Sequence, residues 1–248
     1  MPPSKKLQSP PPSLRFERPL TTVDLVVFTV RNERLEVLLV RRPNTPEEPF
    51  PGAWALPGGF VDTQRDSSLE DTARRKLKEK TGVKTPYLEQ LGSWGSAKRD
   101  PRGWSATHVY FALIPSEGVA LQEGGNSPVA QWVAVDTPPK DQAMAFDHAD
   151  ILASALQRLR SKVEYTSLPA HLLPQPFTLP QLQKTYETVL GRGLDKSGFR
   201  TRMLAAGFLE EAGAMDVGAP RAAMGYRLKP EQTLTYFPRT FSPRGDSV

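Results

Sequence analysis

Four prolines, at positions 169, 174, 176 and 180, fall between Tyr165 and Pro180 and divide the chain into two parts. Proline lacks a backbone N–H and fixes φ, so a cluster of prolines interrupts both helix and strand patterns. A chain of 248 residues is long enough for two domains of ordinary size. We therefore predict two folded units joined by a linker at residues 165–177.

The part before this junction has the pattern of a mixed α/β domain, predicted at residues 21–164. Residues 23–30 and 34–42 are rich in Val and Leu, and the turn-forming Arg31-Asn32-Glu33 between them predicts a β-hairpin. The remaining apolar patterns predict strands at 87–93, 107–114 and 130–135, and helices at 68–81 and 148–162.

The composition excludes several classes of function. The chain has no cysteine, which removes disulfide scaffolds and thiol catalysis, and its three histidines lie too far apart for one helix to present two of them to a metal. Residues 1–20 are proline-rich and basic, which predicts a disordered arm and not a secretory signal, and residues 238–248 are expected to be a tail. No apolar run reaches the ~18 residues of a membrane helix. We expect a cytoplasmic protein with no membrane partner, and its net charge of +5 favours anionic ligands.

A glycine-rich loop followed by a helix is the most informative motif of the first part. Residues 55–61 (ALPGGFV) precede a helical segment at 69–83. This arrangement resembles the Nudix box, which reads G-x5-E-x7-R-E-U-x-E-E-x-G-U with U aliphatic. The resemblance implies the α/β/α sandwich of that family. The matching positions are the loop, Arg75, Leu77, Glu79, Gly82 and Val83.

The metal-binding positions of the Nudix box are changed in this chain. Positions 76, 79 and 80 share one helix face through i+3 and i+4 spacing, and a working box has glutamate at all three. Here they are Lys76, Glu79 and Lys80. A divalent cation ~5 Å from one ammonium group would meet a repulsion of roughly 7 kcal/mol at an effective dielectric near 20. We therefore expect no metal of the usual kind and no catalytic residue, and we interpret Glu70 and Asp71 as helix-start residues.

The same loop and helix can bind a nucleotide-like ligand without cleaving it, because lysine ammonium groups pair directly with a diphosphate. Resemblance to ADP-ribose-binding Nudix proteins implies an ADP-ribose-like effector, with no cofactor required. Core packing is an alternative interpretation of Phe50 and Trp54. Asp147 is expected to cap the helix that follows it, and the alternative is a ligand contact by Asp147-His148. The expected effector contacts are Arg41, Arg42, Phe50, Trp54, Gly58, Gly59, Lys76, Glu79 and Lys80.

The part after the junction, residues 178–237, has the element order of a winged helix-turn-helix. Thr178 and Gln181 form the pattern of a capping box, and the helix that they begin is expected to stop at Gly191. A second helix is expected from about Asp195 to Gly207, and two short strands should bracket residues 212–225.

The second of these helices has the pattern of a recognition helix. Phe199 and Met203 form an apolar face, while Lys196 and Arg200 form a basic one that suits DNA phosphates. An ordinary basic surface helix is the alternative. The expected DNA contacts are Arg192, Lys196, Ser197, Arg200, Thr201 and Arg202, with Arg221 at the tip of the wing.

A degenerate Nudix domain followed by a winged helix resembles the Nudix-related transcriptional regulators of NAD metabolism, the NrtR family. The resemblance implies a homodimeric repressor that binds double-stranded operator DNA and senses ADP-ribose or a related NAD-derived metabolite. Two alternatives stay open at this point. The chain could be a metal-dependent Nudix hydrolase that uses Glu70, Asp71 and Glu79, or a ligand-binding module that contacts another protein.

Overall fold

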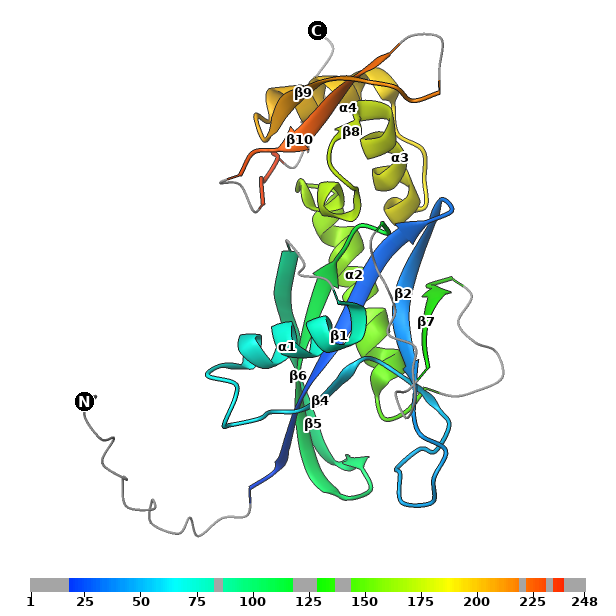
Figure 1. Cartoon of the computed structure of the whole chain (residues 1–248), viewed down its shortest axis with the longest axis vertical. Coiled ribbons are helices and arrows are strands. Elements are labelled where there is room, and N and C mark those ends of the chain that lie inside the picture. Colours follow the sequence, from blue (N-terminus) through cyan, green and yellow to red (C-terminus); the bar gives the residue numbers. More distant parts are fainter. Residues whose placement is uncertain are drawn as a thin grey trace, which may run out of the picture.

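The computed structural model of the chain describes residues 18–82, 87–117, 129–136, 144–218, 222–230 and 234–238. A sheet flanked by helices forms the first part, and a smaller helical unit with a β-hairpin lies beyond one end of that sheet (Figure 1). The arm predicted at residues 1–20 and the tail predicted at 238–248 fall almost entirely outside the described residues. Within the described ranges, no helix is long and apolar enough to cross a membrane.

One mixed sheet forms the centre of the first part. Its strand order is β3-β2-β1-β6-β5, with β4 paired to β1 and β7 paired to β2. Strands β1 and β2 form the predicted hairpin, and β1 pairs with β6 in parallel. The strands are β1 (Leu20–Arg31), β2 (Arg34–Arg41), β3 (Trp54–Ala55), β4 (Gly58–Phe60), β5 (Tyr87–Asp100), β6 (Gly103–Leu113) and β7 (Ala130–Ala134).

Two helices cover opposite faces of this sheet, which explains the unbroken burial of β1 from Val23 to Thr29. Val23, Leu25 and Val27 share a core with α1 (Leu69–Thr81). The alternate residues Val26 and Phe28 point to the other face and share a core with α2 (His148–Val163). The predicted α/β/α sandwich is present in the structure.

The helix ends follow the expected chemistry with one exception. The Ser68 side chain accepts a hydrogen bond from the Asp71 N–H, and Gly82 ends α1 in the left-handed region at φ 69°. Asp147 occupies the N-cap position of α2 but makes no capping hydrogen bond with its side chain. The capping role predicted for its carboxylate is therefore wrong, because that carboxylate accepts a hydrogen bond from Arg99 instead.

The segment predicted as a linker, residues 165–177, is a packed element and not an open connection. Residues Leu168–Leu172 form a 3₁₀ helix, η1, and all five are buried. Its leucines belong to the same apolar core as α2 and α3 (Leu179–Leu190), and the Tyr186 hydroxyl donates to the Thr166 carbonyl oxygen at 2.7 Å. The prolines interrupt regular structure here, as expected, but the leucines between them hold the two parts on one continuous core.

The second part has the predicted helix, turn, helix and hairpin. The capping box of Thr178 and Gln181 begins α3, which ends at Gly191 with φ 70°. The Asp195 carboxylate caps the next helix by accepting from the Gly198 N–H at 2.6 Å. The elements are β8 (Phe177–Thr178), α3, α4 (Lys196–Ala205), β9 (Leu209–Met215) and β10 (Ala223–Leu228), and the three strands pair in the order β8-β10-β9.

Candidate ligand pocket and recognition helix

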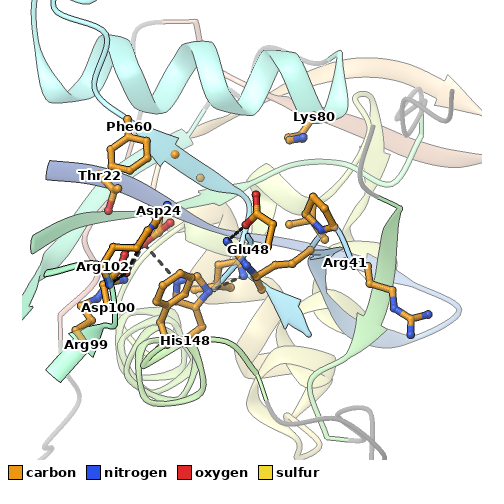
Figure 2. Close-up of a pocket in the computed structure, with 18 residues that line it drawn as sticks. Thr22, Asp24, Arg41, Glu48, Phe60, Lys80, Arg99, Asp100, Arg102 and His148 are labelled. Atoms are coloured by element: carbon orange, nitrogen blue, oxygen red, sulfur yellow. Dashed lines mark hydrogen bonds and ion pairs between the residues drawn. The ribbon is translucent and has the colours of Figure 1, made fainter. Parts of the chain in front are cut away.

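A cavity of about 240 Å³ opens between the glycine-rich loop, the last turn of α1, the start of α2 and the β5–β6 hairpin. Figure 2 places Lys80 on one side of it and the polar side chains Asp24, Arg99 and His148 on the other. The lining residues come from segments far apart in the sequence, so the pocket exists only in the folded domain.

A buried ionic network forms the floor of this pocket. The Arg99 guanidinium lies 3.1 Å from an Asp24 carboxylate oxygen and 2.9 Å from Asp147. His148 Nε2 approaches the same Asp24 oxygen at 3.4 Å, and the Leu56 N–H donates to His148 Nδ1 at 2.9 Å. Because Nδ1 is the acceptor, the ring proton resides on Nε2, facing Asp24. The network thus ties β1, β5 and the start of α2 to the glycine-rich loop.

The pKa of Asp24 reflects this network. Burial raises the pKa of the carboxyl group, but the His148 ring, a Thr107 hydrogen bond and the Arg99 charge together outweigh that effect and lower it below its ordinary value. Asp24 is therefore ionised at neutral pH and is satisfied by its neighbours. A buried charge with this set of partners is strongly held in place.

The glycine-rich loop packs so closely that side chains are excluded at two positions. A Cβ atom on Gly58 would lie 2.6 Å from the Val23 carbonyl oxygen. Gly59 has φ 151°, and a Cβ there would meet the side chain of Lys76 at 3.0 Å. The loop backbone therefore packs directly on β1 and α1. Because Gly58 and Gly59 also line the cavity and have no side chains, their backbone is accessible to a ligand there.

The one carboxylate left in the Nudix box is surrounded by basic groups. Glu79 lies 3.1 Å from Arg75, 3.4 Å from Lys76 and 3.9 Å from Arg65. Burial raises the pKa of Glu79, but the hydrogen bonds and charges of Arg75 and Lys76 outweigh it, and the pKa is lowered. Arg75 also holds Asp66 at 2.6 Å, and this hydrogen bond keeps the pKa of Asp66 far below its ordinary value. Glu79 and Asp66 are therefore both paired with arginine in the folded protein.

Lys80 differs from Lys76 in its surroundings. Its side chain lines the cavity, and burial together with the Lys76 charge lowers its pKa from the ordinary value. Lys76 instead packs against Gly59 and pairs with Glu79, outside the lining. Of the two lysines at positions where a working box has glutamate, Lys80 lines the cavity and Lys76 does not.

The pocket includes some of the predicted effector contacts and leaves out others. Lys76 and Glu79 pair with each other, Phe50 packs on Phe146 with ring centroids 4.8 Å apart, and half-buried Trp54 packs against the core. These four lie outside the lining. The core-packing interpretation fits Trp54, whereas Phe50 is 38% exposed and contacts Phe146 at the surface. The predicted residues that line the cavity are Arg41, Arg42, Gly58, Gly59 and Lys80.

Several pocket residues were not anticipated from the sequence. The signal available was an acid, Asp24, inside the apolar strand β1, and the charged turn Arg99-Asp100-Pro101-Arg102 between two strands. A lone charge in a buried strand needs a partner, so this acid was a marker for a site. His148 also lines the cavity, which is the position that the ligand-contact alternative for Asp147-His148 requires. The lining residues missed are Thr22, Asp24, Val40, Pro43, Glu48, Ala55, Leu56, Phe60, Arg99, Asp100, Arg102 and Phe146.

The second charged surface is α4. Phe199 and Met203 bury the inner face of this helix, and the Phe199 ring packs edge-on against Tyr186 at 5.1 Å. The opposite face is exposed along the first two turns. In the part of the chain that the structure describes, its side chains make no hydrogen bond or ion pair with the protein. They are Lys196, Ser197, Arg200 and Thr201.

Two predicted DNA contacts are instead engaged within the protein. Arg202 donates to the backbone oxygens of Glu164, at 3.1 Å, and Pro238, at 3.2 Å. Arg192 pairs with the Glu164 carboxylate at 3.1 Å. Helical spacing turns Arg202 toward the protein and away from the exposed face of α4. Arg221, the predicted wing contact, lies outside the described residues.

Comparison with known proteins identifies both parts. Residues 20–155 match the model of the NUDIX domain, and residues 169–228 match that of the NrtR DNA-binding winged helix domain. The ADPR responsive transcriptional repressor NtrR of Acinetobacter baylyi is 45% identical over 224 residues, which cover 90% of this chain and 88% of that protein. The chain belongs to the NrtR family.

Solved NrtR structures have the same two-part architecture. Shewanella oneidensis NrtR complexed with a 27mer DNA has a TM-score of 0.80 at 41% identity, and the match covers 88% of this chain and 98% of that chain. The NUDIX domain of the same NrtR complexed with ADP ribose is 43% identical, with a TM-score of 0.50, over 58% of this chain and 90% of that chain. The fold class predicted from the sequence is confirmed.

The Nudix fold is associated with a divalent metal ion, and the donor set of this NrtR chain does not fit one. Glu70 pairs with Arg74 in the first turn of α1, whereas Glu79 lies nine residues further along, about 13 Å away by helical rise. One ion cannot bind both carboxylates at ligand distance. Across the described ranges, no group of three His, Asp or Glu residues is placed to hold a metal.

Proposed function

We propose that this protein is a transcriptional repressor whose winged helix binds operator DNA and whose Nudix domain binds ADP-ribose, or a related NAD-derived metabolite, as effector without hydrolysing it. The observation that carries the proposal is the pocket beside α1, where Lys80 occupies a position that a metal-binding glutamate has in a working Nudix box. The relationship to an ADPR responsive repressor supports it. Genes of NAD metabolism are the proposed targets, and the cytoplasm is the proposed place of action.

The pocket offers a dinucleotide-like ligand three kinds of contact. The Lys80 ammonium group can pair with a diphosphate, and the close-packed Gly58-Gly59 backbone lets phosphate oxygens approach the loop. Phe60 is 47% exposed and lies under the Arg102 guanidinium at 5.4 Å, so it provides an aromatic surface at the pocket. Five basic and three acidic side chains line the cavity, which favours an anionic ligand.

The exposed face of α4 provides the DNA-binding surface in this proposal. Lys196 and Arg200 neutralise phosphates or reach base edges, and Ser197 and Thr201 add hydroxyl groups that can hydrogen-bond to either. Their side chains are exposed and ready for a polyanion. This assignment separates the four outward residues from Arg192 and Arg202, which contact the protein.

A homodimer is the proposed functional form, because two winged helices on one operator must meet half-sites at a fixed spacing. An effector that rotates the two helices out of phase weakens DNA binding without touching DNA. Such an effector must bind the DNA-competent and DNA-incompetent conformations with unequal affinity. The shared core of the two parts gives the Nudix domain a direct mechanical connection to α3.

Calorimetric titration of ADP-ribose into the purified protein, in EDTA, tests the effector assignment. Binding without metal is the expected result, and absence of binding would remove the effector proposal. Incubation of ADP-ribose with the protein and magnesium, followed by a phosphatase-coupled phosphate assay, tests the hydrolase alternative. Rapid turnover would favour the hydrolase. We expect none, because Glu70 and Glu79 are too far apart to bind one metal ion.

A gel-shift experiment with promoter DNA and with random DNA tests the DNA-binding assignment. The promoter DNA is taken from upstream of the genes that neighbour the gene of this protein. We expect the protein to retain this DNA at a concentration that leaves random DNA unbound. If neither DNA is retained, the C-terminal unit would instead be a surface for another protein.

A further inference from the structure

The helix α2 connects the two functional surfaces of the molecule. Its first residue, His148, lines the pocket, and its C-cap residue, Glu164, contacts the unit that carries α4. A helix of 16 residues spans about 24 Å. In Figure 1, α2 runs from the level of the sheet toward the winged helix unit.

The pocket end of α2 is held by polar contacts. The Leu56 N–H of the glycine-rich loop donates to His148, and Arg99 pairs with Asp147 at the N-cap position. A ligand that displaces the loop or the Arg99 side chain therefore acts on the first turn of α2. Because an α-helix is stiff along its axis, such a displacement reaches the other end of the helix.

The far end of α2 is held by two arginines from the DNA-binding unit. The last carbonyl groups of a helix lack intrahelical partners and carry the negative end of the helix dipole, so they attract cations. Arg202 donates to the Glu164 backbone oxygen at 3.1 Å, while Arg192 pairs with the Glu164 side chain. Arg202 extends from α4 itself, which makes it the direct contact between α2 and the recognition helix.

Arg202 is fixed by more than this one hydrogen bond. It also donates to the Pro238 carbonyl oxygen at 3.2 Å, and its guanidinium lies 5.1 Å from the centre of the Phe237 ring. Phe237 is 6% exposed and packs against Phe208. The guanidinium therefore has two acceptors and an aromatic surface within the protein.

We infer that Arg202 is a positioning residue for DNA binding: it fixes α4 on the C-terminal end of α2, so that Lys196 and Arg200 meet DNA at the correct angle, and makes no DNA contact. The inference also concerns regulation, and this part rests on the proposed function, because the effector would bind at the N-terminal end of α2 while Arg202 contacts its C-terminal end. Release of DNA then includes a change at the Arg202 contact.

Salt dependence distinguishes a positioning arginine from a phosphate-binding one. Each lost phosphate contact reduces the slope of log affinity against log salt by about one. Loss of a positioning contact instead lowers the fraction of protein with α4 correctly placed, so affinity falls while the phosphate contacts in the complex, and therefore the slope, are kept. The experiment measures fluorescence anisotropy of labelled operator DNA over a series of salt concentrations with the full-length protein. Arg200→Met is the matched comparison, because Arg200 is on the same helix and faces outward.

For Arg200→Met we expect weaker binding with a slope reduced by about one per recognition helix. For Arg202→Met we expect roughly tenfold weaker binding with a slope within about half a unit of that of the unmodified protein. An Arg202→Met slope reduced as much as that of Arg200→Met would overturn the inference, and so would unchanged affinity.

Arg202→Lys keeps the inference testable if Arg202→Met does not fold. Lysine binds phosphate as a point charge, so a phosphate contact would survive this substitution with near-normal affinity. Both hydrogen bonds of Arg202 come from its Nη2 atom. Lysine has a shorter side chain and lacks the planar group that lies over the Phe237 ring, so the inference expects a several-fold loss. Near-normal affinity in Arg202→Lys would contradict it.

The regulatory part is tested by repeating the DNA titration with saturating ADP-ribose. In Arg202→Lys, the ratio of DNA dissociation constants with and without ADP-ribose should fall toward one, while calorimetry finds ADP-ribose binding within about twofold of the unmodified protein. An unchanged ratio would contradict the regulatory part. If the unmodified protein itself does not respond to ADP-ribose, the proposed effector function fails, whereas the salt-slope result for Arg202 stands independently.

Discussion

The pocket and the recognition helix both present basic side chains to an anion, but they hold those side chains in opposite ways. In the pocket, Arg99 is paired with Asp24, and Arg102 is paired with Asp100 at 2.8 Å. On α4, Lys196 and Arg200 have no carboxylate partner within the described ranges. The pocket arginines are fixed by the protein before a ligand arrives, whereas the α4 cations are available to any polyanion.

This difference fits the two kinds of ligand. A small anion is selected by the shape of its pocket, so rigid, paired side chains that hold a defined geometry are useful there. DNA offers a repeating line of phosphates, and unpaired cations gain most of their binding free energy by releasing counterions. The comparison predicts that substitutions in the pocket change stability and effector affinity, while those on α4 change the salt dependence of DNA binding.

The largest effect is expected for Arg99→Met. Removal of the guanidinium leaves the buried Asp24 carboxylate with His148 and Thr107 as partners but without a paired arginine, and breaking a buried pair in this way costs about 3–5 kcal/mol of unfolding free energy. Arg74→Met is the matched control, because Arg74 forms an exposed pair with Glu70 worth less than about 1 kcal/mol. Urea unfolding measures both, and equal losses would remove the distinction between pocket and surface pairs.

The next effect is expected for Lys80→Met. Loss of one charge-assisted contact to a diphosphate costs about 1.5–3 kcal/mol, or roughly ten- to a hundredfold in ADP-ribose affinity. Lys78→Met is the control, because Lys78 is exposed in the same turn of α1 and does not line the pocket. Calorimetry should find near-normal binding for the control. Equal losses in the two variants would mean that Lys80 acts only through long-range charge.

A smaller effect is expected for Lys196→Met on α4. Operator affinity should weaken similarly for all DNA sequences, and the salt slope should fall by about one per helix. Lys184→Met is the control. Lys184 is an exposed cation on α3 that pairs with Glu33, and its loss should leave the salt slope unchanged. A salt slope unchanged in Lys196→Met would show that this residue does not contact phosphate.

The smallest effect is a pH dependence at the base of α1. The hydrogen bond from Arg75 lowers the folded-state pKa of Asp66, so this carboxylate contributes stability at pH values above its unfolded pKa near 4 and loses it as the pH falls further. Asp66→Asn should therefore be less stable than the unmodified protein at pH 7, and the difference should shrink below about pH 4. Thermal unfolding across this range tests it, and a difference independent of pH would contradict the assignment.

Local sequence patterns predicted most of the fold. The hairpin of β1 and β2, the capping box at Thr178 and the stop at Gly191 are each fixed by neighbouring residues, so the sequence alone was sufficient to place them. The packed junction at η1 was not predictable in this way. Its burial depends on tertiary packing: its leucines share one core with α2, α3 and strands of the sheet, and the local pattern of prolines does not show that packing.

The site was predictable where one motif carries it and not where distant segments meet. Lys80 lines the cavity beside the glycine-rich loop, whereas Lys76 and Glu79 of the same motif pair with each other outside it, which helical spacing alone could not separate. The partnership of Asp24, Arg99 and His148 joins three separate elements, so no local pattern reveals it. Charge predicted Arg202 as a DNA contact, but charge alone could not show that this side chain donates to the Glu164 and Pro238 carbonyl oxygens, because that depends on how α4 packs.

The most direct test of the account is retention of labelled operator DNA as ADP-ribose is added in EDTA, followed by analysis of the nucleotide. The account predicts that the DNA is released at saturating ADP-ribose and that the ADP-ribose is recovered intact. DNA that stays bound at saturation, or release that requires magnesium and consumes ADP-ribose, would contradict a pocket that senses its ligand through Lys80 without metal.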